Sequence, residues 1–265
     1  MANTVRLFKR GLNILTTEGP VELLSRFAGF GTYLIESEYY GRIAKHNSPY
    51  EYHGVVLPLD MDVFDNRVRH AFLTNSYEAS EIELIDEYVT GSYDLVDLGA
   101  STGFTTVYGL SKLDERARSI AVEANPEMIP VMESVQKMND VKFDIESAAY
   151  DPEQSEVDFH VHDKTVSSST KRQGGSKMTI PTVSMADIVA KHGIEEFVCL
   201  VDIEGGEIGL VQEELELLEK TCAIIIIEIH EMDGIATETK HQMADSEFEL
   251  ADTSGDVYVY LNDAF

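Results

Sequence analysis

The sequence predicts an α/β fold with a doubly wound, mostly parallel sheet. Strand-like and helix-like stretches alternate along most of the chain, as they do when helices cover both faces of a parallel sheet. Several strand-like runs are continuously apolar, which is typical of strands buried on both faces. The 265 residues are enough for one full core. We expect a main domain over residues 76–265 and a helical and hairpin extension over residues 1–75.

The extension differs in charge from the rest of the chain. Residues 1–50 hold six Lys and Arg against four Glu, which gives a net charge of +2. Because the whole chain carries −28, the remaining residues carry −30. Apolar and basic residues over 5–15 predict an amphipathic helix, and Val21 to Phe30 predicts a second. Residues 1–30 would dock on a membrane surface or a partner enzyme, or would form a cap packed on the main domain.

The next elements lead into a glycine-containing turn. Residues 52–61 predict a short edge strand or hairpin, and residues 76–88 predict a helix. Leu95, Val96 and Leu98 then predict a buried strand, after which the chain turns into another helix.

The spacing of this turn indicates a nucleoside site. Gly99 and Gly103 allow a ligand close to the backbone at a helix N-terminus. Glu123, at the end of the following strand, is placed to accept hydrogen bonds from a ribose. Asp97-x-Gly99-x-x-x-Gly103 differs from the dinucleotide pattern and fits S-adenosylmethionine better, although a tight turn in another α/β protein stays open as an alternative.

Further along, residues 126–138 predict a helix, 142–145 a third strand and 157–161 a half-exposed strand. The loop 163–177 contains four cations and one acid, so it either binds an anionic part of an acceptor or is simply solvated. His160 and His162 have no nearby carboxylate or cysteine at ligand spacing, and we predict no metal site.

Two later strand ends carry polar side chains. Residues 178–183 predict a strand, Ser184 a helix cap, and 197–203 a buried strand that ends at Asp202 and Glu204. Because parallel sheets bind ligands outside the carboxyl ends of their strands, we expect both acids near Gly99. Glu204 would otherwise cap the helix predicted over 206–220.

The most apolar run, residues 222–229, predicts the fifth parallel strand and is followed by His230. This position makes His230 a candidate base, or a histidine held by local hydrogen bonds. Residues 248–250 and 257–261 predict a closing antiparallel hairpin.

Composition limits the partners and the environment. The charge of −28 would repel nucleic acid, and in a chain with 43% hydrophobic residues it indicates adaptation to molar salt, where self-repulsion is screened. Cys199 and Cys222 lie within apolar runs and are expected to be buried thiols. We expect a cytoplasmic protein, with the inner face of the membrane as a second location if residues 1–30 dock there.

The chain resembles the FkbM-type methyltransferases that depend on S-adenosylmethionine, from about residue 77 to residue 261. The resemblance is carried by DLGASTGF (97–104), VEANPE (122–127), TIPTVSMADIV (179–189), LVDIEGGE (200–207) and IIIIEIHE (224–231). It implies a Rossmann-like class I methyltransferase fold with a seven-stranded sheet, a member from a halophilic archaeon, and methyl transfer to an oxygen of a sugar, glycan or other small acceptor.

The resemblance also implies roles for individual residues. The cofactor would be bound by Asp97, Gly99, Ala100, Gly103, Glu123 and Ala124. The reacting centre would be bordered by Asp202 and Glu204, with His230 or Asp202 as base. Leu200 stands where the family usually has a lysine, which leaves open a different acceptor or a non-catalytic partner of a glycan-assembly complex. Tyr108 and Lys112 match the Y-x-x-x-K pattern of NAD-dependent short-chain dehydrogenases, but we expect them to pack or face solvent.

Overall fold

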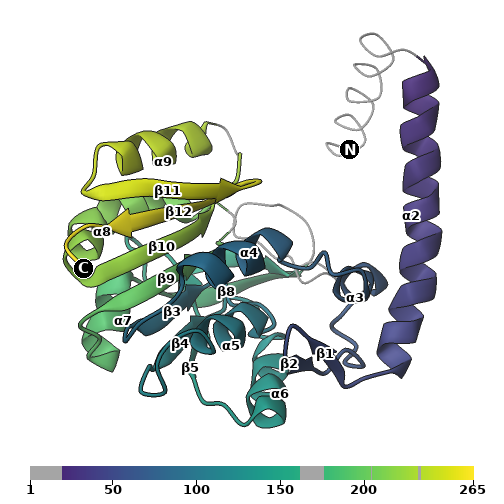
Figure 1. The fold of residues 1–265 in the computed structure, drawn as a ribbon, viewed down its shortest axis with the longest axis horizontal. Helices are drawn as coiled ribbons and strands as arrows, with labels where there is room; N and C mark the ends of the chain where they lie inside the picture. Colours follow the sequence, from purple (N-terminus) through teal and green to yellow (C-terminus); the bar gives the residue numbers. More distant parts are fainter. Residues whose placement is uncertain (1–19, 162–175, 204, 232–233) are drawn as a thin grey trace.

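The computed structural model describes residues 20–161, 176–203, 205–231 and 234–265 (Figure 1). The helix predicted over residues 5–15, His162, most of the loop 163–177 and Glu204 lie outside these residues.

Seven strands form the central sheet. Their bounds are β3 Asp94–Leu98, β4 Ser119–Val122, β5 Asp144–Glu146, β9 Phe197–Val201, β10 Cys222–Glu228, β11 Phe248–Ser254 and β12 Val257–Asn262. Their spatial order is β11-β12-β10-β9-β3-β4-β5. Neighbours from β10 to β5 pair in parallel, while β12 is antiparallel to both β10 and β11. Among these seven strands, β12 therefore runs against the other six.

Helices cover both faces of the sheet (Figure 1). On one face lie α4 Ala79–Tyr88, α5 Phe104–Leu110 and α6 Ile129–Asn139, and on the other α7 Met185–His192, α8 Glu207–Thr221 and α9 Ile235–Ala244. Alternate residues of β9 enter the two cores, with Val198 and Leu200 on the α5 side and Cys199 and Val201 on the α8 side. The predicted Rossmann-like fold is confirmed.

The N-terminal extension contains α2 Pro20–His46, a hairpin of β1 Tyr50–Tyr52 and β2 Val55–Leu57, and α3 Asn66–Leu73. The helix predicted to end near residue 30 continues to His46. The hairpin attaches to the main domain through Asn139 of α6, whose side chain accepts a hydrogen bond from the amide of Val56 (2.8 Å) and donates to its carbonyl (2.9 Å). The first part of α2 extends away from the sheet (Figure 1). Among the helices described, none combines the length and apolar character needed to cross a membrane.

A smaller sheet lies beside the end of β4. It consists of β6 Ala149–Tyr150, β7 Glu156–Val161 and β8 Ser176–Val183, with β8 between the other two. The alternating strand predicted over 157–161 is β7, and its antiparallel pairing with β8 places Val161 opposite Ser176. Phe159 and Ile180 pack with Ala124, so this hairpin stands next to the predicted cofactor residues.

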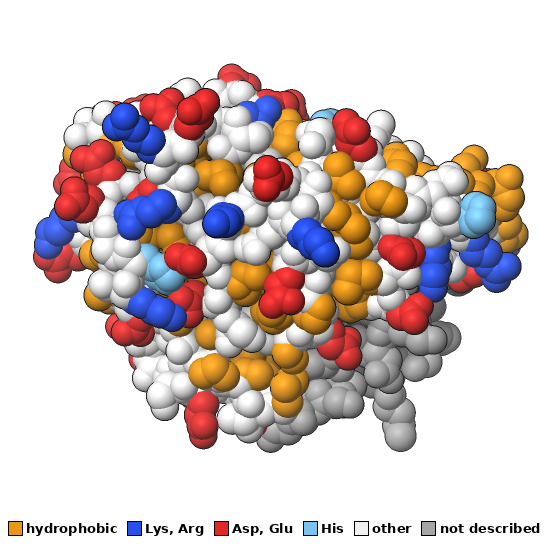
Figure 2. Space-filling model, turned by 90° about the horizontal axis from the view of Figure 1, so that it is seen from below, with side chains coloured by type: hydrophobic (Ala, Val, Ile, Leu, Met, Phe, Trp, Pro, Cys, Tyr) orange, Lys and Arg blue, Asp and Glu red, His pale blue; other side chains and the backbone are white. Residues whose placement is uncertain are grey.

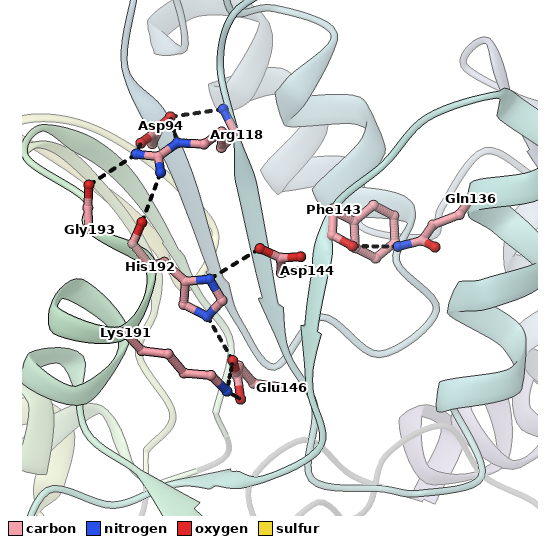
Figure 3. A network of polar contacts seen from close by, with 9 residues as sticks. All are labelled: Asp94, Arg118, Gln136, Phe143, Asp144, Glu146, Lys191, His192 and Gly193. Atoms are coloured by element: carbon pink, nitrogen blue, oxygen red, sulfur yellow. Dashed lines mark hydrogen bonds and ion pairs between the residues drawn. The ribbon is translucent and has the colours of Figure 1, made fainter.

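A polar network joins α7 to the far edge of the sheet (Figure 3). Arg118 forms an ion pair with Asp94 and donates a hydrogen bond of 2.8 Å to the carbonyl of His192. His192 is the last residue of α7, and a cation at a helix C-terminus is favourable. The His192 ring lies between Asp144 and Glu146, and Lys191 also pairs with Glu146 at 2.6 Å. Figure 2 shows the molecule from below, with basic side chains scattered among acidic ones on that face.

Candidate active site

The turn after β3 is tied to the end of β4. The backbone amides of Gly99 and Ala100 both donate to the carbonyl of Val122, at 2.9 and 3.0 Å. Gly99 and Gly103 have φ of +89° and +77°, values that glycine adopts without steric strain. Gly103 is the N-cap of α5, and its amide donates to the carbonyl of Ala100 at 2.7 Å. The predicted glycine turn therefore lies at the carboxyl ends of two adjacent strands.

Glu123 is held beneath this turn by backbone amides. It is 8% exposed and accepts from Ser101 N at 2.7 Å and from Asn125 N at 2.6 Å, one bond to each carboxylate oxygen. Burial raises its pKa to about 7, against the opposing effect of these amides. Each oxygen keeps a second lone pair that could accept from a ribose hydroxyl. The buried side-chain amide nitrogen of Asn125 has no hydrogen-bond partner among the described residues, so a ligand with an acceptor group fits here.

Asp97 is buried at the base of the same region. Its Oδ2 accepts from the hydroxyls of Thr105 (2.9 Å) and Thr106 (2.6 Å) of α5. Burial raises its pKa to about 6 despite these two bonds. A carboxylate fixed in this way suits the positively charged end of S-adenosylmethionine.

Asp202 and His230 come together at the ends of β9 and β10. His230 Nε2 lies 3.7 Å from Asp202 Oδ1 and 3.7 Å from Glu228 Oε1, while its Nδ1 is 2.5 Å from Glu207 Oε1. The Glu207 hydrogen bond raises the pKa of His230 to about 9, although burial opposes it, so the ring holds both protons at neutral pH.

One pocket joins the two halves of the site. Asp97, Gly99 and Ala100 line it from the cofactor side, and Asp202 and Glu228 line it from the ends of β9 and β10. Leu200, at the position of the family's lysine, is 5% exposed and also lines the pocket.

Several acidic residues at this pocket were missed by the sequence predictions. Glu78 and Glu81, at the start of α4, line it together with Tyr77. Burial raises the pKa of Glu78 well above its ordinary value, with further contributions from Glu81 and Asp202. Burial also raises the pKa of Glu228. Glu228 could have been found from its place at a strand end, whereas nothing local in the sequence marks Glu78 or Glu81.

Tyr108 and Lys112 do not form a dehydrogenase pair. Tyr108 is 5% exposed and stacks on Phe104, and its hydroxyl donates a hydrogen bond to Asp86 at 2.7 Å. The ammonium group of Lys112 lies over the Tyr108 ring and forms an ion pair with Asp86. Neither residue lines the pocket described above, in agreement with the expectation that they pack or face solvent.

A comparison with known protein families gives a match over most of the main domain. A family model described as "Methyltransferase FkbM domain" matches residues 97–257, more than half of the chain. No curated protein matches the chain.

Three solved structures are similar to the chain at low sequence identity. A ribosomal protein L11 methylase from Lactobacillus delbrueckii subsp. bulgaricus has a TM-score of 0.41 at 10% identity, over 68% of this chain and 74% of that chain. A fibrillarin from Aeropyrum pernix with natively bound S-adenosyl-L-methionine has a TM-score of 0.38 at 13% identity, over 65% and 68%. A precorrin-6y C5,15-methyltransferase from Geobacter metallireducens has a TM-score of 0.42 at 9% identity, over 69% and 87%.

Proposed function

Because the chain belongs to the FkbM methyltransferase family, we propose that it transfers a methyl group from S-adenosylmethionine to an oxygen of a sugar, a glycan or a related small acceptor. The observation that carries this proposal is the shared pocket. Gly99 and Ala100 of the cofactor turn and Asp202 of the β9 end line one cavity, so a donor and an acceptor can meet there.

Within this proposal the residues of the turn and of the β4 end hold the cofactor. Glu123 accepts from the ribose, Ala124 borders the adenine, and Gly99, Ala100 and Gly103 let the nucleoside approach the backbone. Asp97 faces the charged amino-acid end. When bound, S-adenosylmethionine supplies a methyl group made electrophilic by its positively charged sulfur.

On the acceptor side, Asp202 is the better candidate for the base. It lines the pocket, whereas His230 is not among the lining residues and lies 3.7 Å from Asp202. A positioned base contributes roughly 10²–10⁴-fold to the rate. We assign Glu204 to orienting the acceptor or the cofactor, and this assignment rests on the family pattern.

The described wall of the pocket favours a neutral acceptor at the reacting end. Glu78, Glu81 and Glu228 line an adjoining open hollow together with Asp256, and this concentration of carboxyl groups would repel an anion. An anionic part of the acceptor would have to contact the cationic segment 163–177 instead. We propose that the reaction takes place in the cytoplasm, with residues 1–30 as the contact to a membrane or a partner enzyme.

The test has two arms. Calorimetry should show binding of S-adenosylmethionine and no binding of NAD, and mass spectrometry of cell-surface glycans and lipid-linked sugars should show a methyl group that disappears without this gene. The base assignment is tested by Asp202→Asn and His230→Gln; normal methyl transfer by both variants would show that it is wrong.

A second function is a non-catalytic, cofactor-binding partner of a glycan-assembly complex. Leu200 favours it, because an apolar side chain replaces the lysine that the family usually places beside the reacting centre. Binding of S-adenosylmethionine without a change in any glycan methyl group would support this second function.

A further inference from the structure

The side chains of Asp202, Glu228 and His230 lie close enough together to bind one metal ion. We propose that these three side chains bind one divalent cation, which in turn holds the acceptor hydroxyl. This inference rests on the proposed function for its use, but the cation site itself can be tested without any acceptor.

The geometry fits ligands around one ion. One ligand atom from each of the three residues lies within 4.8 Å of the others. The two distances from His230 Nε2, both 3.7 Å, are too long for hydrogen bonds. Metal–oxygen distances of about 2.0–2.6 Å put the ligand atoms of a single cation about 3–5 Å apart. A cation that replaces the proton on His230 Nε2 would therefore find both carboxylates at ligand spacing.

Glu207 supplies an independent indication. Its side chain is fully buried, its Oε1 lies 2.5 Å from Nδ1 of His230, and its Oε2 has no hydrogen-bond partner among the described residues. A carboxylate that accepts from the outer nitrogen of a histidine fixes the ring orientation and makes the other nitrogen a better ligand. Here the other nitrogen faces Asp202 and Glu228. A cation would take the place of the proton on Nε2, and its charge would help to compensate the buried Glu207.

The ligand set suggests which ion binds. Carboxylates suit Mg²⁺ and Mn²⁺, and an imidazole favours a transition metal, so Mn²⁺ matches both ligand types. Three protein ligands leave coordination positions open. An acceptor hydroxyl in one of them would lose its proton to the second, unbound oxygen of Asp202, the base proposed above, and its oxygen lone pair would then form the new C–O bond. The C–S bond breaks with its electron pair remaining on sulfur.

A second group of acids, Glu78, Glu81 and Glu228, also lies within ligand distance. It contains three carboxyl groups and no histidine, so it offers no imidazole to a transition metal. His230 belongs only to the first group and Glu81 only to the second, so variants of these two residues distinguish the two sites.

The experiment titrates Mn²⁺ into the full chain after chelator treatment, in molar KCl, and follows free Mn²⁺ by electron paramagnetic resonance. We expect one saturable site in the wild type. His230→Gln and Asp202→Asn should weaken it at least about tenfold, and Glu207→Gln should weaken it about 10–100-fold through the ring orientation. Glu81→Gln should bind as the wild type does, as should Glu216→Gln on the exposed face of α8. Calorimetry with S-adenosylmethionine checks that each variant is folded.

The absence of a saturable site would overturn the inference, as would wild-type affinity in both His230→Gln and Asp202→Asn. Weaker Mn²⁺ binding by Glu81→Gln would also overturn the inference, because the acids of α4 would then determine the affinity. A wild-type chain that binds Mn²⁺ but not S-adenosylmethionine would contradict the proposed function and leave the cation site standing. Binding of S-adenosylmethionine without a Mn²⁺ site would overturn the cation site and leave the proposed function standing.

Discussion

The backbone carbonyl oxygen of Asp202 occupies the space that a side chain on Gly99 would need. A Cβ built on Gly99 would lie 1.9 Å from this oxygen, and the amide of Asp202 donates to the carbonyl of Leu98 at 2.9 Å. The glycine turn after β3 and the end of β9 are thus in direct backbone contact. A change on either side is transmitted to the other.

Gly99→Ala should therefore abolish cofactor binding and destabilise the fold. The positive φ alone costs about 1–2 kcal/mol for a residue with a Cβ, and the clash with Asp202 adds to it. Gly193→Ala is the matched control, since Gly193 also has a positive φ (+62°) but no atom within 4 Å of the added Cβ. Thermal unfolding and calorimetry with S-adenosylmethionine should show a modest loss of stability for the control and normal binding. Equal effects of the two changes would contradict the argument.

Glu123→Gln should weaken both the fold and the cofactor site. The two carboxylate oxygens accept from Ser101 N and Asn125 N, and an amide has one acceptor oxygen, so one backbone amide would face the new NH₂ group. Leaving a buried donor unsatisfied costs about 1–3 kcal/mol. Glu127→Gln, four residues along and exposed, should change neither the melting temperature nor the affinity for S-adenosylmethionine.

The fold was predictable from the sequence because its signals are local. Leu95, Val96 and Leu98 in one strand and Ile224 to Ile227 in another are apolar enough to require burial on both faces, and the structure buries them. The length of α2 was not predictable from such signals. Gly41 suggests a break in a helix, but its missing side chain makes room for Asn66 of α3, whose Cβ lies 2.5 Å from the position of a Cβ on Gly41.

The site was predictable only where strand ends mark it. Asp202 and His230 follow buried strands, so topology alone brings them together. Glu207 looks in the sequence like an acid in the first turn of a helix, and its pairing with His230 spans 23 residues. Glu78 and Glu81 precede the whole sheet and reach the pocket because α4 packs against β10 and β12. No spacing rule connects residues that meet through the packing of a helix on a sheet.

Asp97→Asn should stabilise the protein relative to the wild type as the pH rises. Burial raises the pKa of Asp97 from 3.8 to about 6, so the folded state binds the proton more tightly than the unfolded state. The contribution of the group to stability is complete below pH 3.8 and is lost as the pH rises through about 6. Asparagine keeps an acceptor for Thr105 and Thr106 without the charge.

The difference in unfolding free energy, measured by chemical denaturation, should shift in favour of Asp97→Asn by about 1–2 kcal/mol between about pH 5 and about pH 8. The same variant should bind S-adenosylmethionine more weakly if the Asp97 carboxylate faces the charged end of the cofactor, as we propose. A free-energy difference that does not change with pH would show that Asp97 is ionised throughout this range.

Salt should stabilise the protein strongly. The chain carries a formal charge of −28, and a Debye length of about 3 Å at 1 M salt removes most of the repulsion between exposed carboxylates. We expect the melting temperature to rise steadily from dilute buffer to molar KCl. Full stability and activity in salt-free buffer would refute the predicted adaptation to high salt.

Glu214 should be among the most important carboxylates for stability, although it lies outside the pocket. Its side chain is 8% exposed and accepts from the amides of Met185 (2.7 Å) and Ala186 (2.8 Å) at the start of α7, and from the hydroxyl of Tyr150. An anion at a helix N-terminus is favourable, and three donors, two of them in buried hydrogen bonds, lose their acceptor if it is removed. Glu214→Ala should therefore lower the unfolding free energy by about 2–4 kcal/mol. Glu213→Ala changes the exposed neighbour on the same helix and should stay within about 0.5 kcal/mol of the wild type. Similar unfolding midpoints for the two variants in urea would mean that α7 does not depend on this carboxylate.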